Sequence, residues 1–249
     1  MKLRIGSRQA LTECICEFGA GTLLLFYAAS GKYLSYVAPR IRPFLFLGAA
    51  ILIGFGIFRL PTIRFRQHRN HSAHCLLLII PVLLLLLPHE STQTVAAGLT
   101  ATPKIETRQS SSEKQQDTDT TLSGLDTSHK HITVSNQDFY PWMEEINEHL
   151  NKYIGYSITM TGFVLKNSVN IHAGEFVPAR LAMTCCTADL TPMGLLCKYD
   201  KAASLKENAW VTVEGTLLKG TFQGSPDPQI QVSKVTSAQP VSDYIYPYQ

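Results

Sequence analysis

The segment from Arg180 to Leu190, RLAMTCCTADL, contains the side chains best suited to chemistry. Two adjacent cysteines are followed, three residues later, by an aspartate. Thiolate, imidazole and carboxylate groups are the ligands that zinc and copper commonly take from proteins. A third cysteine, Cys197, and a histidine, His172, lie in the same polar half of the chain. The residue types therefore predict a site for a zinc or copper ion, with these candidate ligands: Cys185, Cys186, Asp189, Cys197 and His172.

Two other interpretations of these cysteines stay open at the level of the sequence. Cys197 could form a disulfide with Cys185 or Cys186, which an oxidising compartment would favour. The cysteines could instead be buried like small apolar side chains. A disulfide between the adjacent pair is disfavoured, because neighbouring Cα atoms are about 3.8 Å apart and disulfides usually need roughly 4.4–6.8 Å. On a regular strand, successive side chains would also point to opposite faces.

Two further histidines, His71 and His74, precede a leucine-rich segment. Residues three apart share a face of a helix, so this pair could present two imidazoles to one metal ion. The alternative is that the surrounding basic loop contacts anionic lipid headgroups. A thiol enzyme would need a base beside its nucleophile, and His172 is the candidate for that role. Nothing else in the sequence supports such an active site, so we expect no enzymatic activity.

The elements around these residues differ sharply between the two halves of the chain. Residues 1–74 hold ten Lys or Arg against two Asp or Glu, whereas the remainder holds twelve against seventeen. Apolar segments occupy about 11–29, 43–60 and 73–88. A membrane-spanning helix needs about 17–25 largely apolar residues, so we expect three transmembrane helices within a domain covering residues 1–89. A cleaved signal peptide is the alternative for the first segment.

The basic residues predict the orientation of these helices. The N-terminus and the second loop carry seven Lys or Arg, whereas the first loop carries three. Short cytoplasmic loops are enriched in such residues, so the N-terminus is predicted to be cytoplasmic and the C-terminal domain extracytoplasmic. Glu13 and Glu17 lie at the start of the first apolar segment, and we expect them at the level of the lipid headgroups, paired with nearby cations.

Residues 90–131 are rich in Ser, Thr and Gln and contain no aromatic residue. Such a segment buries too little apolar surface to offset the entropy of ordering, so we expect a disordered linker. The domain that follows, residues 132–249, begins with an amphipathic pattern of Phe139, Trp142, Ile146 and Leu150, which predicts a short helix.

Five windows with period-two alternation follow that helix, and they predict strands. They are GYSITMTGFVLKN, ARLAMTCC, MGLLCKYD, NAWVTVEGTLLKG and PQIQVSKVTSA. Five short strands and one helix favour a small all-β, OB-like barrel, with an open sandwich as the alternative. OB-like barrels often bind nucleic acid, but this half is acidic, whereas phosphate binding needs a high density of basic residues. We therefore expect no nucleic-acid partner.

Several motifs resemble those of the YcgQ-like family of bacterial permease subunits. They are YLSYVAPRIRPFL, HRNHSAH, YIGYSITMTGFV, RLAMTCCTADL and AWVTVEGTL, and they are distributed over nearly the whole chain. The resemblance implies a membrane domain followed by a domain of unknown function, a separate multi-span permease as partner, and a link to metal homeostasis. Cys185, Cys186 and Asp189 match the Cys-Cys-x-x-Asp element of that family, whereas Cys197 does not belong to it.

These observations together lead to one main expectation of function. The protein is expected to be a multi-pass protein of the cell membrane and a non-enzymatic accessory subunit of a permease in the same bilayer. Its extracytoplasmic domain would bind a solute or a metal ion. One alternative is an envelope sensor or scaffold, and another is a thiol-based metal-handling protein.

Overall fold

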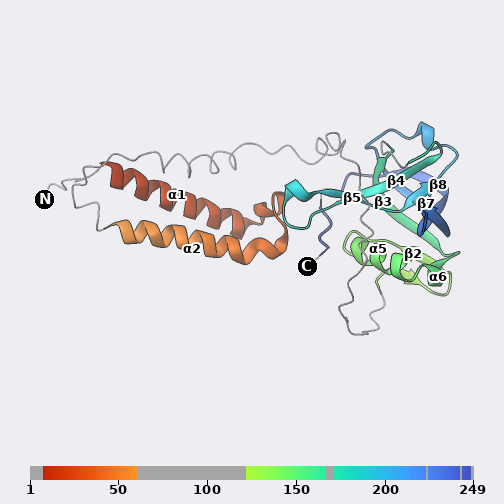
Figure 1. Ribbon diagram of the computed structural model, residues 1–249, viewed down its shortest axis with the longest axis horizontal. Coiled ribbons are helices and arrows are strands. Elements are labelled where there is room, and N and C mark those ends of the chain that lie inside the picture. The colour runs from red at the N-terminus through yellow and green to blue at the C-terminus, as the bar shows by residue number, and fades with distance from the viewer. Residues whose placement is uncertain (1–7, 61–121, 167–170, 223, 242, 248–249) are drawn as a thin grey trace. The chain divides into compact units, whose positions relative to one another are not determined.

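A computed structural model describes residues 8–60, 122–166, 171–222, 224–241 and 243–247 (Figure 1). The chain divides into two compact units. One is built from the N-terminal helices and also includes the loop residues Cys185–Ala188, and the other contains the barrel strands.

The N-terminal unit contains two long helices that lie side by side, α1 (Arg8–Ser30) and α2 (Arg42–Arg59). Two short 3-10 helices, η1 (Lys32–Ser35) and η2 (Pro39–Ile41), connect them. Small residues allow the close approach: a Cβ on Gly21 would lie 2.8 Å from the Ile53 side chain. Interfaces between membrane helices are commonly enriched in such small residues.

One helix among the described residues, Pro39–Phe58, is long and apolar enough to cross a membrane. The first predicted span corresponds to α1, of which Cys14–Ser30 is a shorter apolar helix. Glu17 is only 8% exposed, as is typical of the packed face of α1 that also holds Cys14, and its expected level in the membrane stays a prediction. The third predicted span, 73–88, lies outside the described residues, as do His71 and His74.

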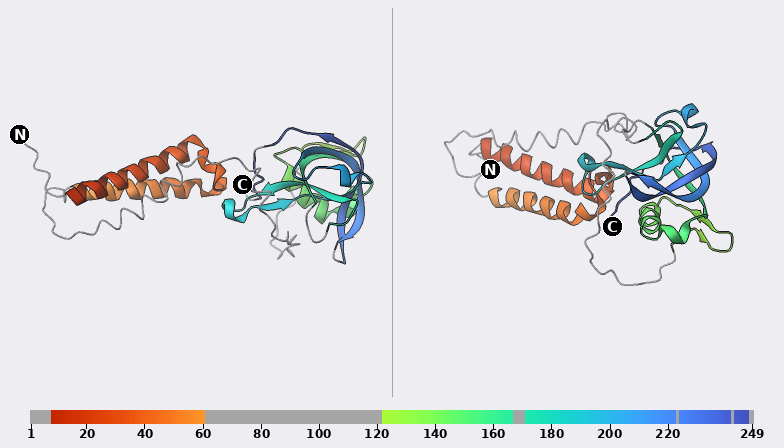
Figure 2. Two further views of the ribbon diagram at one scale, coloured as in Figure 1. Left: turned by 90° about the horizontal axis from the view of Figure 1, so that it is seen from above. Right: turned by 45° about the vertical axis from the view of Figure 1, so that its right-hand side comes forward.

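The C-terminal unit is a closed five-stranded β-barrel preceded by helices. Its strands neighbour one another in the order β3-β7-β8-β6-β4, and β4 pairs with β3 to close the barrel (Figure 2). The pairing between β6 and β8 is parallel, whereas the other four pairings are antiparallel. The barrel strands are β3 (Ser157–Leu165), β4 (Glu175–Ala182), β6 (Leu196–Lys198), β7 (Trp210–Phe222) and β8 (Ser225–Ser237).

The predicted alternation is confirmed most clearly on β7. Val211, Val213 and Leu217 point into the core, whereas Trp210 and Thr212 are only partly buried. This period of two is the reason the segment forms a strand with one face toward the barrel interior. Each of the five predicted strand windows overlaps a barrel strand, although only the windows for β3 and β6 contain the whole strand.

Gly162 lies where β3 passes from pairing with one strand to pairing with two. The strand pairs with β7 along Ser157–Phe163 and with β4 along Phe163–Leu165. A Cβ on Gly162 would lie 2.5 Å from the carbonyl carbon of Pro178 in β4. Only a residue without a side chain allows this approach, and the pairing with β4 begins at the next residue, Phe163, while the register with β7 runs through Gly162 without a shift.

The predicted amphipathic helix forms α5 (Phe139–Glu148) and α6 (Leu150–Tyr153). Phe139, Trp142 and Ile146 are each no more than 1% exposed and belong to the same core as the barrel strands. The apolar face predicted from the sequence therefore packs as expected. Figures 1 and 2 show α5 beside the barrel rather than within its sheet.

Two strands of the C-terminal unit lie wholly or partly before residue 132, the predicted start of the domain. Two short strands, β1 (Leu125–Asp126) and β2 (His131–Thr133), pair with each other, and β2 continues the sheet parallel to β3. The indole N–H of Trp142 donates a hydrogen bond of 2.9 Å to the Ser123 carbonyl. The end of the predicted linker is thus held by backbone pairing and by a buried tryptophan, which composition does not reveal.

Candidate metal centre

The two adjacent cysteines lie in a loop that follows β4. That strand ends at Ala182, and the loop contains a short 3-10 helix, η4 (Thr187–Asp189), before β5 (Thr191–Met193) begins. The prediction that Cys185 and Cys186 continue the strand was therefore wrong. The alternation that would have sent their side chains to opposite faces does not apply to this loop.

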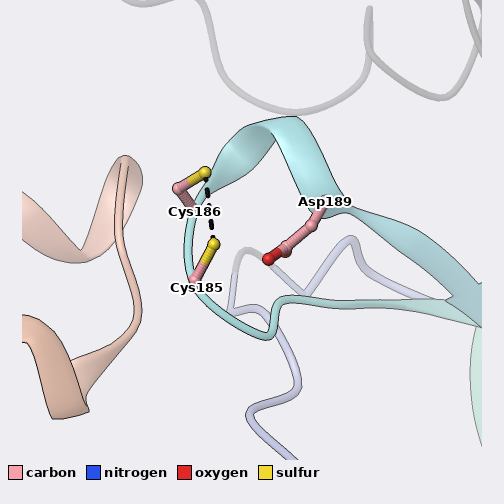
Figure 3. Close-up of side chains that lie close together, drawn as sticks. All are labelled: Cys185, Cys186 and Asp189. Carbon is pink, nitrogen blue, oxygen red and sulfur yellow. Dashed lines mark hydrogen bonds between the residues drawn. The ribbon is translucent and has the colours of Figure 1, made fainter.

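The loop brings two thiols and one carboxylate together. The sulfur atoms of Cys185 and Cys186 are 3.6 Å apart, and the ligand atoms of these two residues and Asp189 all lie within 4.8 Å of one another. Figure 3 shows the carboxylate of Asp189 pointing toward the sulfurs. We call this group the CCD cluster, comprising Cys185, Cys186 and Asp189.

The sulfur separation fits metal binding better than a disulfide. An S–S bond is about 2.0 Å long, so the 3.6 Å distance describes two thiols. Two thiolates bound to one tetrahedral zinc ion, with Zn–S bonds of about 2.3 Å, lie roughly 3.8 Å apart. The two sulfurs are therefore spaced nearly as two thiolate ligands of one zinc ion would be.

The backbone of the loop orients the carboxylate. The Thr184 N–H donates a hydrogen bond of 3.0 Å to Oδ1 of Asp189. A carboxylate has two oxygens and about four lone-pair sites, so it can accept this bond and also ligate an ion. Cys185 is exposed and Cys186 is partly exposed, so solvent ions have direct access to the cluster.

Cys197 does not join the cluster. It lies on β6, is 0% exposed, and its thiol is 3.6 Å from the Leu195 carbonyl oxygen. Burial raises the pKa of this thiol well above its usual value, which opposes the thiolate form that binds metals. The expectation of a ligand or disulfide partner was therefore wrong for Cys197. Its role is that of a small buried side chain in the barrel core.

His172 also lies apart from the cluster. Its Nδ1 is 3.3 Å from Oε2 of Glu175, and its side chain is 82% exposed. The prediction that it completes the metal shell is wrong for this structure, because the imidazole is paired with a neighbour three residues along the chain. His71 and His74 fall outside the described residues.

Sequence reasoning missed the elements that hold the loop. Ala182 pairs with Thr191 of β5, and Ile245, near the end of the chain, forms a parallel bridge with Ala182. Arg180, in the same strand, is only 1% exposed. An arginine within the apolar run FVPARLAM is the one signal that could have indicated a buried charge here.

Comparisons with known proteins support the family resemblance. Residues 109–247 match the family described as the DUF1980 C-terminal domain. The chain is 28% identical over 122 residues to the UPF0703 protein YcgQ of Bacillus subtilis (strain 168). That alignment covers 48% of this chain and 42% of the relative, so the chain matches less than half of the relative's length. Neither description states an activity.

Proposed function

The chain belongs to the DUF1980 C-terminal domain family, and we propose on that premise that it handles a thiophilic metal ion as an accessory subunit of a membrane permease. The CCD cluster would bind the ion. The helical unit would place the protein in the membrane beside the permease. The single observation that carries the proposal is the convergence of two thiols and a carboxylate within 4.8 Å on an accessible loop.

The residue types of the cluster define the class of ion. Thiolates select zinc or monovalent copper over magnesium and calcium, which prefer oxygen ligands. A single carboxylate oxygen is compatible with zinc, whose sites often combine sulfur, nitrogen and oxygen ligands. Because the thiols must lose their protons to bind, the affinity should fall as the pH is lowered. We therefore propose zinc as the first ion to test, and monovalent copper as the second.

We further propose that the protein crosses the membrane more than once, with its C-terminal domain outside the cytoplasm. The apolar helix Pro39–Phe58, the shorter apolar helix Cys14–Ser30 and the leucine-rich segment 73–88 support this topology. The excess of Lys and Arg in the N-terminus and second loop supports the orientation. Reporter fusions after Gln249 test it, and activity of a reporter that works only in the cytosol would overturn it.

The strand order supports an OB-like assignment for the barrel. Numbered along the chain from one to five, its strands neighbour one another as one-two-three-five-four, and strand four returns to strand one. Strands three and five are the parallel pair. The OB-fold is a five-stranded Greek-key barrel whose loops take part in ligand binding. The CCD cluster lies on the loop that follows the second strand.

The metal proposal is tested with the full chain purified in detergent. Zinc and monovalent copper are titrated against competing chelators, and bound metal is measured directly. We expect one ion per chain. Cys185→Ser and Cys186→Ser should each lower the affinity by more than about 100-fold, beyond the range typical of residues that only support a metal ligand.

Matched controls come from the same chain. Cys197→Ala removes a thiol that lies outside the cluster, so it should retain the ion. Asp200→Asn removes an exposed carboxylate and is the control for Asp189→Asn. A wild-type chain that holds no ion, or an equal loss of binding in Cys197→Ala, would contradict the metal proposal.

The permease role is tested separately by purifying the tagged chain from solubilised membranes of its natural host. We expect a multi-span membrane protein to copurify in a stoichiometric amount. The double variant Cys185→Ser/Cys186→Ser should retain that partner, since the helices are proposed to make the contact. Copurification of a water-soluble envelope protein instead would favour a sensor or scaffold.

A further inference from the structure

Arg180 places a positive charge in the interior of the C-terminal unit. Its guanidinium lies between two aromatic rings, 5.8 Å from the centroid of Phe139 and 5.5 Å from that of Trp210. Two neutral oxygens accept its hydrogen bonds. Nη1 donates to Oδ1 of Asn136 at 2.6 Å, and Nη2 donates to the carbonyl oxygen of Asp243 at 2.8 Å.

Burying this charge costs free energy that its contacts only partly recover. Desolvation lowers the pKa of Arg180, and the negative charge of Asp243 acts in the opposite direction. An apolar side chain of similar size would commonly serve stability as well or better. The burial of Arg180 is therefore best explained by the two segments that its hydrogen bonds hold, one at Asn136 and one at Asp243.

One of those hydrogen bonds fixes the C-terminal tail, the described residues 243–247. Two residues after Asp243, Ile245 is 4% exposed and pairs with the end of β4. Its N–H donates to the Leu181 carbonyl at 2.9 Å, and its carbonyl accepts from the Met183 N–H at 2.8 Å. The tail therefore pairs with β4 through a single residue, Ile245, on the side of β4 opposite β5.

This pairing ends just before the CCD cluster. Met183 is two residues before Cys185, and the next residue, Thr184, donates its N–H to Asp189. On the other side, β5 pairs with β4 through Ala182 and Thr191. The end of β4, where the cysteine loop starts, is thus paired on one side with β5 and on the other with the tail. Arg180 holds the tail through its hydrogen bond to the Asp243 carbonyl.

We propose that Arg180 is a positioning residue for the Cys185–Cys186 thiol pair, acting by fastening the C-terminal tail against the end of β4. As far as metal affinity is concerned, this inference rests on the proposed function. The geometry of the thiol pair can also be measured without any natural metal. Phenylarsine oxide condenses with two neighbouring thiols, forming two As–S bonds and releasing water, so its affinity reports whether both sulfurs are held close together.

The test compares Arg180→Met with the wild-type full chain in detergent. Methionine keeps an apolar stem between the two rings but makes neither hydrogen bond. We expect affinity for phenylarsine oxide and for zinc to fall about tenfold, as is typical when a group that orients metal ligands is removed. The melting temperature should stay equal or rise, because a buried charge has been replaced by an apolar group. If Arg180 served only stability, its replacement would lower the affinity only together with the melting temperature.

One control variant and one matched pair of variants test whether Arg180 acts through the tail. Asn136→Ala removes one acceptor of Arg180 but leaves its bond to Asp243, so arsenical affinity should stay within about twofold, the scale of an ordinary surface change. Ile245→Ala and Ile245→Pro both shorten the buried side chain, but only proline removes the N–H that pairs with Leu181. The proline variant should lose arsenical affinity beyond the loss in the alanine variant.

The outcomes distinguish this inference from the proposed function. If the wild-type chain binds no zinc but Arg180→Met still weakens arsenical binding, the metal proposal fails and the positioning role stands. If Arg180→Met is folded and binds both probes as the wild type does, the positioning role is overturned. Should Arg180→Met fail to fold, equal affinities in the two Ile245 variants would overturn it.

Discussion

Cys186 and Cys197 are eleven positions apart, yet they differ in exposure and in the groups that surround their thiols. Cys186 lies in a loop, partly exposed, with a second sulfur 3.6 Å away. Cys197 lies on a barrel strand, is fully buried, and has its pKa raised by burial. The comparison teaches that the exposure of a cysteine here depends on where a strand ends, because a residue beyond the strand leaves the packed interior.

The largest expected difference is in the rate of alkylation. With metal removed by a chelator at pH 8, iodoacetamide should modify Cys185 and Cys186 more than about 100-fold faster than Cys197, because burial limits both access and thiolate formation. Mass spectrometry of peptides at timed intervals measures each site. Similar alkylation rates for Cys186 and Cys197 in the folded chain would contradict the prediction that the loop thiol reacts faster than the buried one.

The second prediction concerns stability. Cys197→Ser places a hydroxyl in an apolar core and should lower the free energy of unfolding by about 1–2 kcal/mol. Cys186→Ser, at a partly exposed loop position, should change it by less than about 0.5 kcal/mol. Denaturant titration of both variants in the same detergent checks the pair. A larger loss for Cys186→Ser would mean that the loop supports the fold.

The third prediction sharpens the role of the carboxylate in the cluster. Asn at position 189 keeps an oxygen that accepts the Thr184 N–H but loses the negative charge. Asp189→Asn should therefore weaken zinc binding by about tenfold, less than either thiol substitution, while leaving the loop in place. Chelator competition measures the affinity. A loss as large as that of Cys185→Ser would make the carboxylate an equal ligand.

The smallest effect extends the comparison to a carboxylate in the barrel. Burial raises the pKa of Asp227, on β8, to about 6 from an ordinary value near 3.8. The folded state thus favours the protonated form, so this contribution to stability is complete below about pH 4 and is lost as the pH rises through about 6.

Asp227→Asn should remove that dependence on pH. Because the side chain is only partly buried and therefore screened by water, we expect the variant to be about 1 kcal/mol more stable than the wild type at pH 7. The two proteins should be equally stable below pH 4. Unfolding measured across this range checks the sign, and a variant less stable at pH 7 would contradict it.

Residue patterns predicted much of the fold, because they report which face of an element avoids water. The spacing of Phe139, Trp142 and Ile146 predicted the helix and its buried face, and the alternation from Trp210 onward predicted β7. Such patterns depend on neighbours only a few residues apart, so they can be read without knowing the partners in space.

The candidate site was predicted only in part. The sequence determined that Cys185, Cys186 and Asp189 lie close along the chain, and their types determined the chemistry available to them. It could not show that β4 stops at Ala182, because a strand ends where its pairing partners end. For the same reason, Cys197 looked like an equal candidate ligand although the barrel buries it.

The sequence by itself determined the apolar helices, the alternating strands and the set of groups that could bind a metal, since these follow from local composition and period. Only the tertiary structure decided which cysteines share a site and that Arg180 holds the chain end beside them. Those outcomes depend on contacts between residues up to 63 positions apart, and such contacts form only when the barrel closes.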